Sequence, residues 1–173
     1  PVDKGPVYIQ SKNERKLIGP AAYYYFDKPD AFYEDREMHN ESWKTVNIPH
    51  DYIINQDNDP TQNNAHGYFK YESAWYRKEF EIQNKGYEDK RLLLQFDGIA
   101  GHSVIYVNGR LVKRNYSAYN SLEADITDSV YFDKKNVIAV YVNTEEFEGW
   151  WYQGGGIYRD VHLTVTEPVA IDL

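Results

Sequence analysis

The chain has 173 residues, of which 42% are hydrophobic and 16% aromatic, and its formal net charge is −8. This length and composition fit one globular domain with a core of its own. The negative charge argues against nucleic acid, whose phosphates need clustered Lys and Arg, and against anionic membranes. The lack of cysteine excludes disulfides, thiolate nucleophiles and cysteine-bound zinc, and it leaves the cellular compartment open.

The start of the chain gives weaker signals. Pro1 is not preceded by Met, and no basic segment followed by an apolar one opens the sequence, so we expect a signal peptide to be absent or already removed. Residues 30–42 admit one or two helical turns without a sustained apolar stripe. Residues 55–65 are polar and read as a long loop, a kind of segment that is often functional or mobile in compact domains.

From residue 75 onward the pattern is that of β-strands. Apolar residues alternate with polar ones in several short segments: Tyr76, Phe80 and Ile82, opposite Trp75, Arg77 and Glu79; Leu92, Leu94 and Phe96; and Leu122, Ala124 and Ile126. Residues 137–142 form the longest apolar run and read as a central strand, far too short to span a membrane. Asn108-Gly109 between apolar runs predicts a two-residue hairpin. Short strands with frequent turns predict an all-β sandwich or barrel, and we expect a two-sheet antiparallel sandwich.

The segment 148–160 is the most informative part of the chain. It contains Glu148, three aromatic residues (Trp150, Trp151 and Tyr152) and a run of three glycines at 154–156. Glycine runs let the backbone turn tightly or approach a ligand or another segment closely. Trp and Tyr offer flat apolar faces with one polar group each, which suits sugar rings as well as packing. We therefore expect a binding rim at this loop.

Arg159 follows the glycine run at the entry to a strand. Alternation from Ile157 to Val165 would place Arg159 among apolar side chains, and a buried guanidinium needs a hydrogen-bonded carboxylate. The sequence therefore predicts a structural ion pair between Arg159 and Asp97 or Asp51.

Other patterns give little indication of chemistry. The five histidines are scattered, which is typical of surface or satisfied core groups. Asp57-Asn-Asp59 suggests calcium, but the sixth and twelfth positions of such a loop would be Gln62 and Tyr68 rather than Gly and Glu. Glu145, Glu146 and Glu148 lie on one loop, whereas glycosidase chemistry needs two carboxylates across a sugar. We expect no catalytic residue, no metal and no cofactor in this chain.

Several motifs, taken in order, resemble the N-terminal domain of glycoside hydrolase family 2, which includes β-galactosidases, β-glucuronidases and β-mannosidases. They cover residues 43 to 165, while residues 1–42 match loosely. The motifs are Trp43-Lys-Thr-Val-Asn-Ile-Pro-His-Asp51, His66-Gly-Tyr68, Trp75-Tyr-Arg-Lys-Glu-Phe80, Phe96-Asp-Gly98, Val107-Asn-Gly109, Asn136 with Val140, and Trp151-Tyr-Gln-Gly-Gly-Gly-Ile-Tyr-Arg159.

The resemblance implies a jelly-roll, galactose-binding-like β-sandwich over residues 1–173, called the sugar-binding domain. In this family it precedes an immunoglobulin-like domain and a catalytic (β/α)₈ barrel, which would be its intramolecular partners. The catalytic glutamates lie in that barrel, which needs roughly 250 residues. The chain is then a non-catalytic fragment of a larger hydrolase of β-glycosides, with β-galactoside the leading substrate and β-glucuronide the next.

The resemblance also indicates where a sugar would be contacted. In family members with β-galactosidase activity, loops of this domain reach into the barrel's active site. The corresponding positions here are His66, Tyr68, Glu148, Trp150, Trp151 and Tyr152. Two alternatives remain: a purely structural domain that supports the barrel without touching sugar, and a free-standing carbohydrate-binding module.

Overall fold

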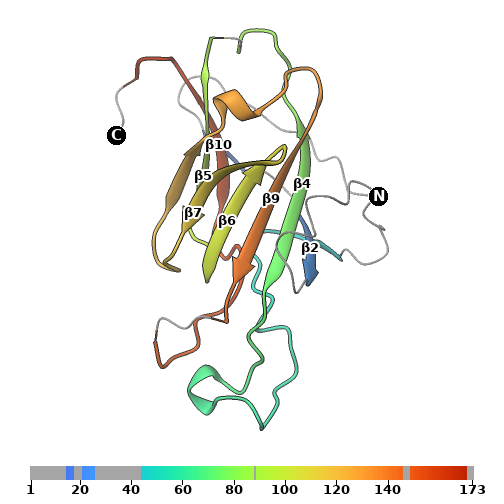
Figure 1. The fold of residues 1–173 in the computed structure, drawn as a ribbon, viewed down its shortest axis with the longest axis vertical. Helices are drawn as coiled ribbons and strands as arrows, with labels where there is room; N and C mark the ends of the chain where they lie inside the picture. The colour runs from blue at the N-terminus through green and yellow to red at the C-terminus, as the bar shows by residue number, and fades with distance from the viewer. Residues whose placement is uncertain (1–14, 18–20, 26–43, 88, 146–148, 171–173) are drawn as a thin grey trace.

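The computed structural model describes residues 15–17, 21–25, 44–87, 89–145 and 149–170 (Figure 1). Its strands are β1 (Arg15–Leu17), β2 (Ala21–Tyr25), β3 (Lys44–Val46), β4 (Ala74–Glu81), β5 (Arg91–Phe96), β6 (His102–Val107), β7 (Arg110–Asn115), β8 (Leu122–Asp125), β9 (Lys135–Asn143) and β10 (Val161–Thr166). Helical structure in these ranges consists of two 3₁₀ turns, η2 (Asn64–His66) and η3 (Thr127–Ser129). The described residues include no helix that is long and apolar enough to cross a membrane. The helical turn expected within residues 30–42 lies outside the described residues.

The strands form two antiparallel sheets. One sheet has the order β1-β10-β5-β8, and the other has the order β3-β2-β4-β9-β6-β7. The chain therefore crosses between the sheets repeatedly, because β5 and β8 pair in one sheet while β6 and β7 pair in the other. The predicted all-β antiparallel sandwich is confirmed.

The alternation seen in the sequence sets which side chains fill the space between the sheets. In β5, Leu92, Leu94 and Phe96 are buried, and Leu94 lies opposite Leu163 in the register with β10. From the other sheet, Tyr76 and Phe80 of β4 join the same core cluster. Each buried aliphatic or aromatic side chain contributes about 1.5–3 kcal/mol, so this layer supplies the main stabilisation of the domain.

The central strands are covered on their outer face as well. Trp75 is fully buried although it lies opposite the main core, where it packs with Ala139, Tyr106 and Tyr141. Its ring centroid is 5.1 Å from that of Tyr141 and 6.0 Å from that of Tyr106. This second cluster explains why residues 137–142 are apolar on both faces.

One charged side chain also points into the sandwich. Lys78 lies between Tyr76 and Phe80 on the inner face of β4 and is only 5% exposed. The alternation predicts an inward position for residue 78, but the charge of lysine hid it from the sequence analysis.

The predicted Asn108-Gly109 hairpin joins β6 to β7. Asn108 has φ 49° and Gly109 has φ 91°, the positive values that a turn of this type requires. The Asn108 amide donates to the carbonyl of Ser129 and to Oδ1 of Asn136, and its own Oδ1 accepts from the amide of Val137. The turn is therefore fixed to the start of β9 by side-chain hydrogen bonds.

Among the described strands, β7 closes one edge of the six-stranded sheet. Arg110, Lys113 and Arg114 of this strand are exposed.

We predict that Asn136→Ala lowers the free energy of unfolding by roughly 3 kcal/mol, because it leaves several buried polar groups without partners. Asn136 is fully buried, its amide donates to the carbonyls of Tyr131 and Lys134, and its Oδ1 accepts from the amide of Tyr131. Urea denaturation measures the change. The control is Asn120→Ala at an exposed position, expected to stay within about 0.5 kcal/mol of the parent chain. Equal stability of the two variants would contradict the prediction.

Candidate functional site

The two segments predicted to contact sugar lie at the same end of the sandwich. Residues 51–73 lead into the start of β4, and residues 144–160 connect the end of β9 to β10. Because Ala74 is paired with Val142, the two segments leave the sheet side by side, at the bottom of Figure 1.

The carboxylate of Asp51 joins these segments. Its Oδ1 accepts from the backbone amides of Ile53 at 2.8 Å, Gly155 at 3.0 Å and Ile54 at 3.3 Å. Its Oδ2 accepts from the hydroxyl of Tyr152 at 2.7 Å. With four donors bound, this side chain holds the loop in place.

Tyr152 is therefore oriented from both ends. Its ring packs edge-on against Phe69, with centroids 5.6 Å apart, and against Tyr71 at 6.5 Å. Burial and the hydrogen bond to Asp51 raise the pKa of Tyr152 well above its usual value, and burial raises the pKa of Tyr71. Both phenols consequently stay protonated, and Tyr152 acts here as a hydrogen-bond donor.

A second link between the segments runs through His66. This residue closes η2, is almost fully buried, and its Nε2 lies 2.9 Å from the carbonyl oxygen of Gly149. Its ring contacts Tyr71 edge-on at 5.5 Å. Gly67 and Tyr68 follow with φ 73° and 61°, so the chain turns sharply and leaves Tyr68 42% exposed.

The aromatic residues next to this clamp are open to solvent. Trp150 is 89% exposed and Trp151 is 52% exposed. The indole nitrogen of Trp151 donates to the hydroxyl of Tyr119 at 2.6 Å, which connects a third loop to the site. Tyr119 lies between β7 and β8 and is itself half exposed. Tyr119 was not predicted from the sequence, although an aromatic residue in a Ser- and Asn-containing loop is a recognisable signal.

The glycine run is needed for packing within the domain. Gly156 has φ 118°, and a Cβ there would lie 2.1 Å from the hydroxyl of Tyr76 and 2.8 Å from the carbonyl oxygen of His50. Its carbonyl accepts from the amide of Ala100 at 2.8 Å. The close approach that the sequence predicted is thus an approach to other segments of the same chain.

His50 lies just behind the glycine run. Its Nδ1 is 2.8 Å from the hydroxyl of Tyr76, and its backbone amide donates to the carbonyl of Ile157. Burial lowers the pKa of His50, so the imidazole stays neutral at physiological pH and keeps its hydrogen bond to the tyrosine.

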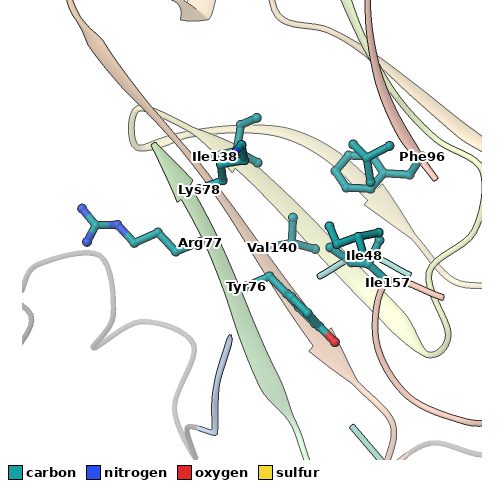
Figure 2. Close-up of a pocket in the computed structure, with 9 residues that line it drawn as sticks. Ile48, Tyr76, Arg77, Lys78, Phe96, Ile138, Val140 and Ile157 are labelled. Atoms are coloured by element: carbon teal, nitrogen blue, oxygen red, sulfur yellow. The ribbon is translucent and has the colours of Figure 1, made fainter. Parts of the chain in front are cut away.

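A small apolar cavity occurs in the core and is not a sugar site. It measures about 20 Å³ and is lined by Ile48, Phe96, Val140 and Ile157 among others, while Arg77 points away from it (Figure 2). Ligand pockets have volumes of roughly 300–1,000 Å³ and offer polar groups, so this cavity can hold no more than a water molecule.

The predicted buried ion pair of Arg159 is wrong. Strand β10 starts only at Val161, so the alternation does not extend back to residue 159, and Arg159 is exposed. Its guanidinium lies 5.3 Å from the centre of the Tyr158 ring. Among the described contacts neither carboxylate is paired with Arg159, since Asp51 binds the loop and Asp97 binds His162 and Gln95.

Asp59 and Glu145 each accept hydrogen bonds from nearby residues. Asp59 accepts from the amide and hydroxyl of Thr61, as in a turn, and these bonds lower the pKa of Asp59. Glu145 accepts from the hydroxyl of Ser73. Glu148, the acidic residue expected to contact sugar, lies outside the described residues.

We predict that Gly156→Ala destabilises the chain by roughly 3–4 kcal/mol, because it adds both backbone strain and a clash with Tyr76. The matched control is Gly86→Ala. Gly86 also has a positive φ, 90°, but an added Cβ would meet nothing within 4 Å. This control should lose only about 1–2 kcal/mol. Thermal and urea denaturation measure both values, and equal losses would mean that close packing at residue 156 is unimportant.

The sequence matches the family model described as "Glycosyl hydrolases family 2, sugar binding domain" over residues 14–168. A β-galactosidase of Bacteroides ovatus is 32% identical over 135 residues, covering 76% of this chain and 16% of that protein. A β-galactosidase of Thermoanaerobacter pseudethanolicus is 31% identical, covering 84% of this chain and 20% of that protein. A putative β-glucuronidase of Formosa agariphila is 34% identical over 146 residues, covering 82% of this chain and 14% of that protein.

Solved structures of similar proteins point to the same family. A glycosyl hydrolase family 2 member from Bacteroides cellulosilyticus superposes with a TM-score of 0.72 at 34% identity, covering 86% of this chain and 20% of that one. A β-glycosidase from Bacteroides vulgatus superposes with a TM-score of 0.78 at 28% identity, covering 91% of this chain and 20% of that one. The chain thus spans about a fifth or less of the length of these relatives. By its sandwich fold and by a family match that covers most of its length, this chain belongs to the sugar-binding domains of glycoside hydrolase family 2.

Proposed function

We propose that this chain works as the N-terminal domain of a larger β-glycoside hydrolase. In this proposal it supports a catalytic barrel and extends the loop 149–152 into the sugar site. The observation that carries the proposal is the pairing of a rigid anchor with an open aromatic surface. Asp51 and His66 fix the loop through Tyr152 and Gly149, while Trp150 projects into solvent.

A sugar contact makes use of this arrangement. Aromatic faces stack on the apolar faces of pyranose rings, and a loop held in one conformation loses little entropy when it binds. Trp151 is pre-oriented by its hydrogen bond to Tyr119, so two aromatic residues from different loops face the same side of the domain. Glu148, next to this surface in sequence, is the acidic residue that we propose contacts the sugar hydroxyls.

The leading substrate class is a β-galactoside, followed by a β-glucuronide. Relatives with both names occur at similar identity, so the sequence comparison supports the β-glycoside class more strongly than one sugar.

A second candidate is a domain that only supports the barrel. A tryptophan that is 89% exposed is also what a domain interface would cover, since large aromatic residues are enriched at such surfaces. The free-standing carbohydrate-binding module is the third candidate, and binding of a β-galactoside by the isolated chain would favour it over both others.

Kinetics of the full-length enzyme distinguish sugar contact from support. We expect Trp150→Ala and Glu148→Ala to raise KM or lower kcat for a chromogenic β-galactoside by roughly 10-fold or more, because each removes a contact to bound sugar. The control is Tyr131→Ala, an exposed aromatic residue before β9 at the opposite end of the sandwich. If both test variants fold and keep the parent kcat and KM, the domain is only a support.

The isolated chain should hydrolyse no glycoside. The proposal assigns the two catalytic carboxylates to a barrel outside these residues, and Asp51 already accepts four hydrogen bonds. Release of nitrophenol from a β-galactoside in proportion to the concentration of purified chain would contradict this, provided that Glu148→Gln abolishes it. Activity that persists in Glu148→Gln would identify a contaminating hydrolase.

A further inference from the structure

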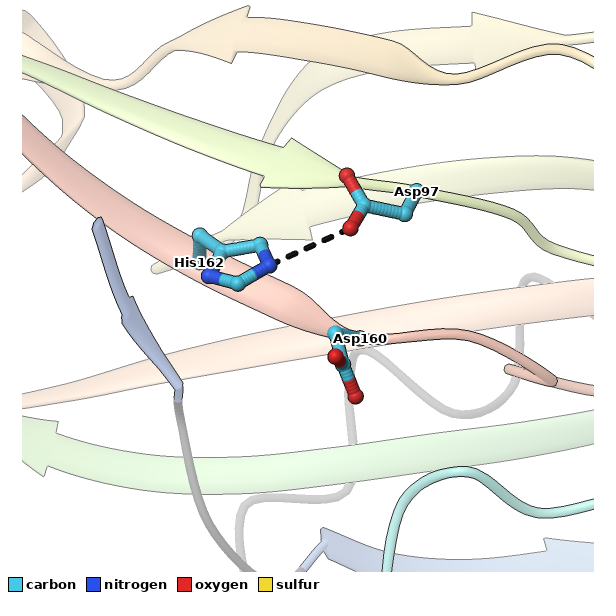
Figure 3. Close-up of side chains that lie close together, drawn as sticks. All are labelled: Asp97, Asp160 and His162. Atoms are coloured by element: carbon cyan, nitrogen blue, oxygen red, sulfur yellow. Dashed lines mark hydrogen bonds and ion pairs between the residues drawn. The ribbon is translucent and has the colours of Figure 1, made fainter.

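Two carboxylates and one imidazole meet on the outer face of the four-stranded sheet. Asp97 follows β5, Asp160 precedes β10, and His162 is the second residue of β10 (Figure 3). The potential ligand atoms of these three residues lie within 4.8 Å of one another. No other group of three such side chains occurs among the residues that the structure describes.

Strand pairing explains why the three side chains meet. Phe96 is opposite Val161 in the ladder, so Asp97 and Asp160 are adjacent at its end, and the Asp97 amide donates to the Asp160 carbonyl at 3.0 Å. His162 lies opposite Gln95 in the same ladder, and the Gln95 side chain bonds Asp97, so His162 and Asp97 share one face of the sheet. Register rather than chance proximity therefore assembles the group.

The spacing already suits a metal ion. A tetrahedral Zn²⁺ with bonds of about 2.0–2.2 Å to nitrogen and oxygen places its ligand atoms roughly 3.3–3.5 Å apart. Nε2 of His162 and Oδ2 of Asp97 are 3.2 Å apart. The third ligand needs to move closer, and Asp160 is exposed, so rotation of its side chain meets little resistance.

Asp97 is also held in the orientation that a ligand needs. Its Oδ1 accepts from the side-chain amide of Gln95 at 3.0 Å, which leaves Oδ2 directed at His162. Such a second hydrogen bond is typical of carboxylates that coordinate metals. The side chain of His162 is only 18% exposed, so its ring position is fixed by the surrounding sheet.

We propose that Asp97, Asp160 and His162 form a binding site for a divalent transition-metal ion, represented by Zn²⁺. An imidazole donor favours zinc, copper, iron or nickel over magnesium, calcium and manganese, which prefer oxygen ligands. Two neighbouring carboxylates repel each other, and a dication removes this repulsion. Three protein ligands leave the remaining position for water or for a group of another domain.

The affinity should be moderate. Coordination through Nε2 places the imidazole proton on Nδ1, and Nδ1 of His162 is buried without a hydrogen-bond partner in the described structure. Metal-bound histidines normally donate this proton to an acceptor, and loss of such a contact weakens binding by about 10- to 100-fold. We therefore expect a dissociation constant on the order of tens of micromolar, well above that of a built structural zinc site, which binds the ion more tightly.

Calorimetric titration of the chain with ZnCl₂ at pH 7.5 tests the proposal. We expect one Zn²⁺ per chain, with affinity reduced more than about 10-fold in Asp160→Asn and in His162→Gln. Asp160 is exposed, so its variant should fold even if the partly buried His162 does not tolerate substitution. Circular dichroism verifies the fold of each variant.

Two variants serve as controls. Asp57→Asn removes an exposed acid from a different loop, and His102→Gln removes a histidine from the other sheet. Both should bind Zn²⁺ as the parent chain does. Saturable binding that weakens only in Asp160→Asn and His162→Gln supports the site. No saturable binding below about 1 mM, or equal binding in all folded variants, overturns the proposal and assigns any heat to scattered surface groups.

Discussion

The hydrogen bonds accepted by Asp51 are the interaction on which the loop end of this domain depends. An aspartate that is half buried needs donors, and here backbone amides from residues 53, 54 and 155 provide them together with the Tyr152 hydroxyl. These donors come from segments about 100 residues apart in the chain. One charge therefore keeps two otherwise irregular loops at a defined distance, and the exposed tryptophans follow the backbone that it fixes.

The glycines make this arrangement sterically accessible. The backbone of residues 154–156 passes between the segment 50–52 and Ala100, with hydrogen bonds to both. A side chain at Gly156 would occupy the position of the Tyr76 hydroxyl. The motif that looked most like a ligand-binding loop in the sequence is thus divided in two. Its glycines serve the domain itself, and its first aromatic residues remain available to something outside it.

The strands could be predicted from the sequence because burial on one face imposes a period of two, and β4, β5 and β8 show that period clearly. The turn at Asn108-Gly109 could be predicted because its backbone angles restrict the residue types. Arg159 was misplaced because a strand boundary depends on hydrogen bonds to other segments, here the bridge between Gly156 and Ala100, which alternation does not reveal.

The candidate site was predicted only in part for a related reason. Trp150, Trp151 and Tyr152 were proposed from the sequence because they stand next to glycines in one segment. The partners of Trp151 and Tyr152 are Tyr119 and Asp51, which are distant in sequence, and nothing local connects them. Lys78 and Trp75 were hidden because a lysine reads as a surface residue and because the outer face of a two-layer sandwich is expected to be open.

The position of β7 has a consequence for how copies of this chain meet. An edge strand carries unpaired backbone groups that invite a strand of another molecule. Two copies of β7 approaching each other would bring together both sets of Arg110, Lys113 and Arg114. The molecule as a whole is acidic, yet the edge that β7 forms among the described strands is basic, so self-association by sheet extension is opposed locally while approach of a negatively charged surface is not.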